Sequence, residues 1–327
     1  MNMLYVVALV VSFFLSILFV PFVFSFSKKL HAKQTILHYV KEHASKAGTP
    51  TMGGLIFILP AIVVPLFFFS SDYMYAIITI VSFFVYGLLG FLDDFIKVYY
   101  KQNLGLKPYQ KIIGQIGISL IIAVFVYQNI GTYIFIPFTQ NTINLGVFII
   151  PFVMLTYIAT VNSVNLIDGL DGLCSCVSLN YLVFFAFILL GTFGASAGVL
   201  GKEIFNLNIA IFSLTGALLG FLIFNIFPAK IFMGDTGSLA LGGFIASISV
   251  LTKMELLILI LGFAYVITAI SDIVQVLHYK RTKKRIFKMA PIHHHFQMRG
   301  LHENKIVFAY FIATFILNLI VLAIYIL

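Results

Sequence analysis

The amino-acid sequence predicts an all-α integral membrane protein that crosses the bilayer about ten times. Hydrophobic residues make up 61% of the chain and charged residues only 9%, whereas about a quarter of the residues in soluble domains are charged. The mean hydropathy of +1.08 agrees with this composition. Because one span takes about 20 apolar residues, we expect residues 1–327 to form a single transmembrane domain with no separate soluble part.

Each predicted span is a long apolar run. The runs cover residues 3–26, 52–69, 75–92, 112–127, 145–161, 172–191, 207–227, 237–251, 256–278 and 305–327. The first run lacks the basic flank and cleavage site of a signal peptide, so we expect it to be retained. The run at 237–251 is the weakest, and a re-entrant loop is the alternative. We keep it as a span, since otherwise the basic segment 280–299 would lie opposite the other basic loops.

Nearly all basic residues fall in alternate loops. The loops at 27–51, 93–111, 162–171, 228–236 and 279–304, with Lys305 at the edge, hold every lysine and arginine except Lys202 and Lys253. The positive-inside rule therefore places these loops in the cytoplasm and both termini outside. The basic run 280–285 is interpreted as a topology signal that also attracts anionic membrane lipids. It has no interleaved aromatic residues and no folded module, which argues against nucleic-acid binding.

Two loops on the opposite side have predicted structure of their own. Residues 132–144 combine β-branched and aromatic residues around a polar turn, which predicts a small external β-hairpin. Residues 195–206 are expected to form a short surface helix. Neither segment carries evident chemistry.

Two adjacent carboxylates, Asp93 and Asp94, follow the third apolar run. Carboxylates at the edge of a membrane span are costly to bury, which makes them candidates for function. On a helix Asp93 and Lys97 share a face, while Asp94 points away from them. The alternative is that the aspartates only mark the end of the helix and that Lys97 pairs with one of them.

The stretch from Lys46 to Gly54 precedes the second run and is rich in glycine and threonine. Its backbone N–H groups and the Thr51 hydroxyl are candidate substrate contacts, because helix N-termini attract phosphate. An ordinary helix start with Pro50 in the turn explains the pattern equally well. The stretch is not a P-loop, since it lacks the Gly-Lys-Ser/Thr ending.

A polar turn joins the fifth and sixth runs. It contains Asn165, Asp168, Gly169 and Asp171 within residues 162–172. Amides and carboxylates held by a glycine turn suit the hydrogen-bonding edge of a uracil or a ribose. The alternative for Asp171 is a helix cap, and the spacing does not fit an EF-hand loop.

The loop at 225–238 contains Asp235, Thr236 and Ser238, all of which are good capping residues for the eighth helix. Asp235 is also a candidate ligand for Mg²⁺, which prefers hard oxygen ligands and normally takes one or two carboxylates plus substrate phosphates. Asp93 or Asp94 would supply the other carboxylate.

Three consecutive histidines, His293, His294 and His295, lie in the last basic loop. They cannot all face one ion from a helix or strand, so we do not predict a zinc site, but they suit contacts with a phosphate. Lysines and a carboxylate-bound metal on one membrane face are what phosphoryl transfer requires, because that chemistry depends on positioning and charge neutralisation.

Five motifs, in order, resemble those of the phospho-N-acetylmuramoyl-pentapeptide transferase family of the polyprenyl-phosphate N-acetylhexosamine-1-phosphate transferase superfamily. They are Gly-Thr-Pro-Thr-Met-Gly-Gly at 48–54, Asp-Asp-Phe-Ile-Lys-Val at 93–98, Asn-Leu-Ile-Asp-Gly-Leu-Asp-Gly at 165–172, Pro-Ala-Lys-Ile-Phe-Met-Gly-Asp-Thr-Gly-Ser-Leu-Ala-Leu-Gly-Gly at 228–243 and Pro-Ile-His-His-His-Phe at 291–296. The resemblance extends from about Lys46 to Gly300.

The resemblance implies a reaction in which undecaprenyl phosphate attacks the sugar-linked phosphate of UDP-N-acetylmuramoyl-pentapeptide, giving lipid I and UMP. It implies that Asp235 binds Mg²⁺ and that Asp93 and Asp94 form a catalytic pair, with His293 beside them. The implied substrate contacts are Lys46, Lys97, Asn165, Asp168, Gly169, Asp171, Asn225, Phe232, His294 and His295, with Phe232 stacking on uracil. The family also implies a homodimer in the bacterial plasma membrane, with its active site on the cytoplasmic face.

One position departs from the family pattern, because Gln297 stands where the family usually has glutamate. We leave it out of the catalytic set. The favoured mechanism is direct attack, with Asp93 or Asp94 orienting or deprotonating the lipid phosphate. A two-step route through a phospho-aspartyl enzyme is the alternative.

Three rival functions remain. A transporter would carry inverted repeats and polar residues at mid-membrane, whereas these carboxylates cluster at one interface. A sister transferase that uses UDP-N-acetylglucosamine is the closest rival, and the histidine run argues against it. Asp235-Thr-Gly matches an aspartyl protease triplet, but this chain has Phe232 where membrane proteases need glycine.

Overall fold

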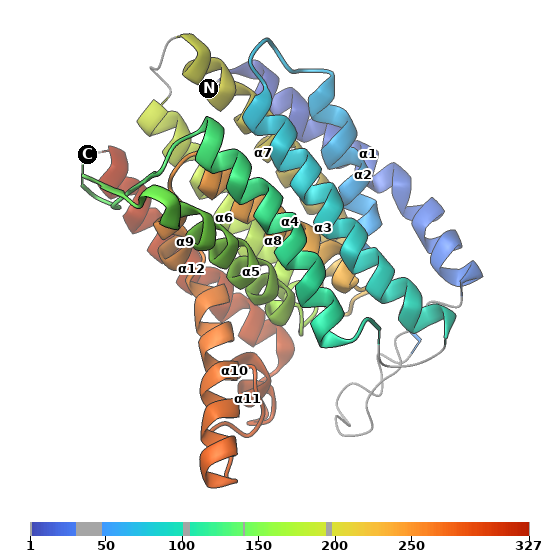
Figure 1. Cartoon of the computed structure of the whole chain (residues 1–327). Helices are drawn as coiled ribbons and strands as arrows, with labels where there is room; N and C mark the ends of the chain where they lie inside the picture. The colour runs from blue at the N-terminus through green and yellow to red at the C-terminus, as the bar shows by residue number, and fades with distance from the viewer. Residues whose placement is uncertain (1, 31–47, 101–104, 140, 194–197, 327) are drawn as a thin grey trace.

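The computed structural model is a bundle of long helices with one small sheet (Figure 1). It describes residues 2–30, 48–100, 105–139, 141–193 and 198–326. The helices are α1 (Met3–Lys29), α2 (Gly54–Leu66), α3 (Met74–Tyr99), α4 (Pro108–Asn129), α5 (Ile149–Ile167), α6 (Leu173–Phe193), α7 (Gly198–Asn225), α8 (Gly234–Leu251), α9 (Ile258–Leu261), α10 (Phe263–Thr282), α11 (Ile292–Gln297) and α12 (Glu303–Ile326). Single 3-10 turns cover Gly146–Phe148 and Glu255–Leu257.

All ten predicted apolar runs contain helix, and the all-α membrane architecture is confirmed. Among the described residues, eight helices are long and apolar enough to span a membrane, and a bent pair makes a ninth. The halves of that pair, Glu255–Leu261 and Phe263–Thr282, meet at 83°. α2 has only 13 residues, which at 1.5 Å per residue is about 20 Å and shorter than the bilayer core.

α8 contains the run that the sequence made weakest, and it is an 18-residue helix. All of its residues from Thr236 to Leu251 are buried. Its glycines allow close approach of its neighbours: a Cβ on Gly243 would lie 2.6 Å from the ring of Tyr86 in α3. The glycines that weaken the sequence signal of this run therefore have a physical cause, since small residues on α8 face other helices rather than lipid.

The predicted hairpin is present at the end of the bundle away from the carboxylates. Strands β1 (Tyr133–Phe135) and β2 (Thr142–Asn144) pair antiparallel, with Ile134 opposite Ile143. The predicted separate surface helix at 195–206 is wrong for the described part of that segment, because α7 runs unbroken from Gly198 to Asn225. Glu203 is buried in this helix, and its carboxylate accepts hydrogen bonds from the Met74 and Tyr75 amides at the start of α3.

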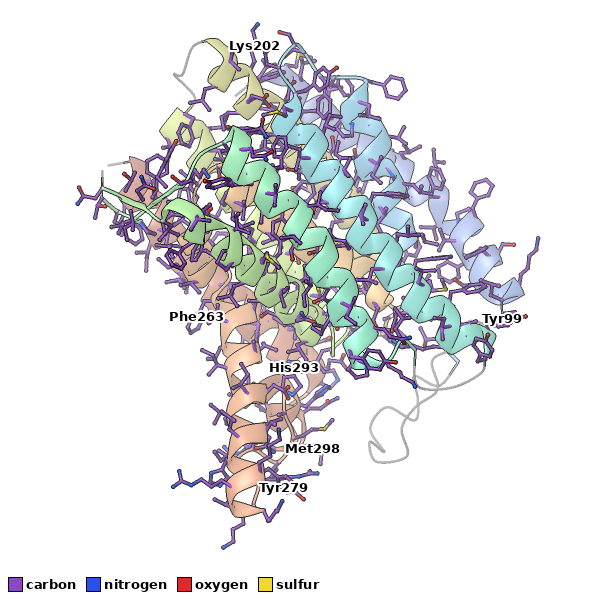
Figure 2. All side chains as sticks on the ribbon, viewed as in Figure 1. Tyr99, Lys202, Phe263, Tyr279, His293 and Met298 are labelled. Atoms are coloured by element: carbon purple, nitrogen blue, oxygen red, sulfur yellow. The ribbon has the colours of Figure 1, made fainter. Side chains whose placement is uncertain are left out.

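The bundle has two distinct ends. Lys202 lies at one end, and Tyr99, at the end of α3, lies at the other (Figure 2). Both chain termini lie at the end away from α11 (Figure 1), which agrees with the prediction that they share one side. α10 projects from the bundle as an arm, and α11 packs beside it (Figure 1). The arm thus brings the histidine run to the end where α3 and α5 finish and α8 begins.

Candidate active site

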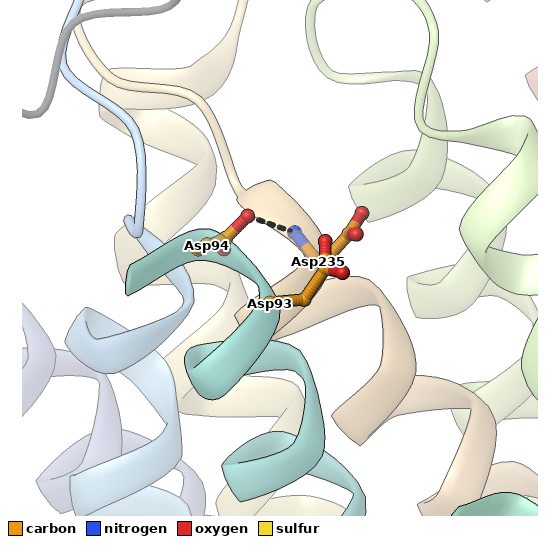
Figure 3. A group of neighbouring side chains, drawn as sticks. All are labelled: Asp93, Asp94 and Asp235. Carbon is orange, nitrogen blue, oxygen red and sulfur yellow. Dashed lines mark hydrogen bonds between the residues drawn. The ribbon is translucent and has the colours of Figure 1, made fainter. Parts of the chain in front are cut away.

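Three carboxylates from two separate parts of the chain meet at this end (Figure 3). Asp93 and Asp94 lie near the end of α3, and Asp235 lies in the first turn of α8. One carboxylate oxygen from each residue lies within 4.8 Å of the other two. The predicted convergence of distant aspartates is therefore present in the fold.

Asp94 fastens the start of α8 to the end of α3. Its Oδ2 accepts hydrogen bonds from the Thr236 amide at 2.9 Å and hydroxyl at 2.7 Å, and its Oδ1 accepts the Asp235 amide at 3.3 Å. A carboxylate at a helix N-terminus satisfies free amides and complements the helix dipole. The cap of α8 thus comes from α3, and the alternative that residues within 235–238 cap their own helix is not what the structure has.

Asp93 faces the lysines instead. Its Oδ1 accepts the Leu106 amide at 2.8 Å, and its Oδ2 lies 2.5 Å from Lys97 Nζ and 3.5 Å from Lys111 Nζ. Lys97 Nζ is also 2.9 Å from Asp235 Oδ2 and 3.8 Å from Asp94 Oδ1. Lys97 therefore pairs with all three carboxylates rather than with one aspartate at a helix end.

Lys111, in the first turn of α4, is a site residue that the sequence reasoning missed. Its Nζ lies 2.8 Å from Asp235 Oδ2. The positive-inside rule already accounts for a lysine at this end of a span, so its presence carried no separate signal.

The donor set fits a hard divalent cation such as Mg²⁺. Carboxylate oxygens are its preferred protein ligands, and one or two of them commonly suffice. The oxygens of Asp93, Asp94 and Asp235 are close enough to share one ion. In the structure the ammonium groups of Lys97 and Lys111 neutralise part of this negative charge. The three carboxylates are thus arranged to bind positively charged groups.

Asn165 orients Asp235 from α5. Its amide nitrogen donates to Asp235 Oδ1 at 2.8 Å and lies 2.8 Å from Ser238 Oγ. Family resemblance placed Asn165 among the nucleotide contacts, and in the structure its amide contacts the carboxylate cluster. Asp235 is therefore held by an amide on one oxygen and by lysines on the other.

Two other predicted site residues, Asp171 and Asn225, form hydrogen bonds within the loops beside the cluster. Asp171 is 4% exposed, and its Oδ2 accepts the Ala229 amide at 2.9 Å. Asn225 is 3% exposed and bonds to the Ser175 hydroxyl at 3.0 Å and to the Ile231 carbonyl at 3.1 Å. These side chains hold the loops in shape, which leaves the half-buried Asp168 and Phe232 as the more accessible groups.

The glycine-rich stretch before α2 uses its amides internally. Gly53 and Gly54 donate to the carbonyls of Phe232 at 2.8 Å and Met233 at 2.9 Å, and the Phe232 amide donates to Pro50. The Gly53 and Gly54 N–H groups are thus bonded to the loop that precedes Asp235. They are not free to donate to a phosphate in this structure. Thr51 remains beside the cluster, close to the position of Gly234 and Asp94. Lys46 lies outside the described residues.

The histidine run divides between two surroundings. A Cβ on Gly169 would lie 2.9 Å from His294 Nε2 and would also meet His293 Nε2, so both rings face the 168–172 loop. His295 instead accepts the Lys288 amide at 3.0 Å within the arm. Burial lowers the pKa of His293 to about 3, which keeps it neutral at pH 7. It can therefore supply a hydrogen bond but not a charge.

Asp168 ends α5 with a carboxyl group in an unfavourable position for ionisation. Burial, together with the charges of Asp235, Asp94 and Asp171, raises the pKa of Asp168 from its ordinary value of 3.8 to about 8. At pH 7 the group is therefore protonated in the folded chain and ionised in the unfolded chain.

This shift predicts a pH-dependent stability effect of Asp168→Asn. Between about pH 4 and pH 8 the folded protein keeps a proton that the unfolded chain has lost, so wild-type stability falls as pH rises through that window. Asparagine does not titrate. Without added divalent cation, the melting temperature of Asp168→Asn is expected to exceed that of the wild type at pH 8, with the difference vanishing near pH 4. A difference that does not vary with pH would contradict the assignment.

Comparisons with known proteins agree with this geometry. The sequence profile of Glycosyl transferase family 4 matches residues 75–253, and the first signature of phospho-N-acetylmuramoyl-pentapeptide-transferase matches residues 46–58. A phospho-N-acetylmuramoyl-pentapeptide-transferase from Thermoanaerobacter sp. (strain X514) is 45% identical over 312 residues, 95% of each chain. One from Clostridium botulinum (strain Eklund 17B / Type B) is 46% identical over 280 residues, 86% of this chain and 83% of the relative.

A third relative of the same name, from Clostridium kluyveri (strain ATCC 8527 / DSM 555 / NBRC 12016 / NCIMB 10680 / K1), is 43% identical over 318 residues, 96% of each chain. All five motifs from the sequence lie within these matches. The chain belongs to the phospho-N-acetylmuramoyl-pentapeptide-transferase family.

Proposed function

We propose that this protein is a Mg²⁺-dependent phosphoglycosyl transferase that moves phospho-N-acetylmuramoyl-pentapeptide from its UDP derivative to undecaprenyl phosphate. The products are lipid I and UMP, a step of peptidoglycan synthesis. The observation that carries the proposal is the cluster of Asp93, Asp94 and Asp235 with two lysines, in a chain 43–46% identical to transferases of that name. Phosphoryl transfer needs such paired positive and negative groups to position and neutralise phosphates.

The three carboxylates have different tasks in this proposal. Asp235 and one aspartate of α3 would hold the Mg²⁺, which would supply positive charge to neutralise the diphosphate. Asp94 keeps α8 in place through the Thr236 amide and hydroxyl. Asp93 would orient the lipid phosphate, one of whose oxygens attacks the sugar-linked phosphorus while the bond to the UMP oxygen breaks.

The lysines would change partners during binding. Lys97 and Lys111 neutralise Asp93 and Asp235 here. When the donor binds, these ammonium groups would turn from the carboxylates toward the anionic diphosphate. His293 and His294, which face the 168–172 loop, would add neutral hydrogen bonds on the donor side.

The site would lie at the cytoplasmic face of the bacterial plasma membrane, because the loops around it contain nearly all the lysines and arginines. The lipid substrate would reach the site from the bilayer. The exposed apolar side chains of α10, such as Ile273 and Leu277, would contact the lipid there. We expect a homodimer, as the family resemblance implies.

Release of UMP tests the proposed function directly. The purified protein is expected to release UMP from UDP-N-acetylmuramoyl-pentapeptide only when undecaprenyl phosphate and Mg²⁺ are both present. UDP-N-acetylglucosamine serves as the control donor. Reaction with the control donor alone would favour the sister transferase, and no UMP from either donor would overturn the proposal.

Lys111 offers a further prediction. Lys111→Met removes one of the two ammonium groups beside Asp235 and is expected to lower turnover about 100-fold, as when one charge-stabilising donor is lost. Lys305→Met, an exposed lysine near the start of α12, is the matched control and should keep wild-type turnover. Steady-state UMP release measures both. Equal activity of the two variants would remove Lys111 from the site.

A further inference from the structure

Three segments that are distant in the sequence meet at the backbone of Asp171. The 168–172 loop joins α5 to α6, the 226–233 loop joins α7 to α8, and α12 begins at Glu303. The Asp171 amide donates to Glu303 Oε1 at 2.5 Å, and the Asp171 carboxylate accepts the Ala229 amide at 2.9 Å. Glu303 thus bonds to one loop directly and reaches the other through Asp171.

The Glu303 carboxylate is suited to hold the Asp171 amide in place. Its side chain is 6% exposed, and a buried carboxylate is stable only when it is hydrogen-bonded. Its bond to a backbone N–H is charge-assisted, which makes it stronger than a neutral hydrogen bond. The adjacent His302 packs its ring edge-to-face on Phe227, with centroids 5.0 Å apart. The start of α12 therefore contacts both loops at neighbouring positions.

These two loops carry the groups that would surround the donor nucleotide. Asp168 and Gly169 lie in the first, beside His293 and His294, and Phe232 lies in the second. Neither loop is part of a helix, so its backbone shape depends on its hydrogen bonds. A carboxylate that fixes the Asp171 amide also fixes the turn that presents Asp168 and Gly169.

We propose that Glu303 is a positioning residue for the donor: through the Asp171 amide it holds the nucleotide-facing loop in its binding shape, without touching substrate. This assignment rests on the proposed function. Because the proposed function puts the lipid phosphate at Asp93, which Glu303 does not contact, loss of the Glu303 carboxylate should affect the donor and not the lipid.

The test compares Glu303→Ala, Glu303→Gln and the control Asn304→Ala in the purified full-length protein. Asn304 is the next residue in the same helical turn and is exposed. Glu303→Ala leaves a buried amide without its acceptor and is expected to raise the donor KM about tenfold, with kcat and the lipid KM near wild type. Glu303→Gln keeps an oxygen acceptor and should recover part of the loss. Asn304→Ala should behave as wild type.

Two readouts separate this effect from misfolding and from failure of the proposed function. Binding of UMP by calorimetry should weaken in parallel with the donor KM, and hydrogen–deuterium exchange should rise at the 168–173 backbone in Glu303→Gln, which keeps the fold. Unchanged UMP affinity and exchange in both variants, or an equal rise of the lipid KM, would overturn the assignment alone. A wild-type protein that binds no UMP would overturn the proposed function and the assignment with it.

Discussion

Asp235→Asn is expected to lower transfer by about 1,000-fold or more, because it removes the carboxylate on which the whole cluster converges. Asp235 contacts Lys97, Lys111 and Asn165 together. Asparagine keeps the size of the side chain and an oxygen toward Asn165, so the change removes charge and metal affinity rather than packing. UMP release from the donor at saturating Mg²⁺ measures the loss.

The matched control is Asp72→Asn, an aspartate at the opposite end of the bundle that pairs with Lys202 at 3.1 Å. It should leave turnover unchanged. Turnover within a few-fold of wild type in a folded Asp235→Asn protein would show that the cluster is not the site of chemistry.

Asp93→Asn is expected to have the second-largest effect, a loss of about 100- to 1,000-fold with the melting temperature close to that of the wild type. Its carboxylate faces Lys97 and Lys111 and not the α8 backbone. Its remaining bond, from the Leu106 amide, can be kept by the asparagine oxygen. The loss should therefore fall on activity alone.

The adjacent Asp94 provides the comparison for this prediction. Asp94→Asn cannot accept all of the bonds from the Thr236 amide, the Thr236 hydroxyl and the Asp235 amide. It is expected to lower the melting temperature as well as turnover, because the start of α8 loses acceptors. If both variants lost stability equally, the division of tasks between the two aspartates would be wrong.

The fold could be predicted from the sequence where it depends on local features, such as the length of an apolar run or the charge of a loop. Apolar length located the long helices of the bundle but not α11, and the charge rule kept 237–251 as a span although this run is short and contains glycines. The rule could not see that the helical part of the second run is only 13 residues long, nor that the two halves of the ninth span, Glu255–Leu261 and Phe263–Thr282, meet at 83°. Those features depend on packing against neighbouring helices.

The site was predictable in part for the same reason. Asp93, Asp94 and Asp235 stand at helix ends that the charge rule places on one side, so their meeting could be expected. The backbone amides that bond to these carboxylates could not be predicted. The Gly53 and Gly54 amides bond to a segment about 180 residues later in the chain, and nothing in the local sequence shows that partner.

Lys111 and Glu303 were missed on similar grounds. A lysine and a glutamate near the ends of membrane helices have ordinary explanations in topology and helix capping. Only the fold brings Lys111 within 2.8 Å of Asp235 and Glu303 within 2.5 Å of the Asp171 amide. Both distances join residues more than 120 positions apart.

We propose that carboxylates from α3 and α8 together hold one divalent cation. Electron paramagnetic resonance of Mn²⁺, which prefers the same oxygen ligands as Mg²⁺, measures this directly in the purified protein. We expect one bound Mn²⁺ per wild-type chain and its loss in Asp235→Asn. No bound Mn²⁺ in the wild type, or undiminished binding in Asp235→Asn, would contradict it.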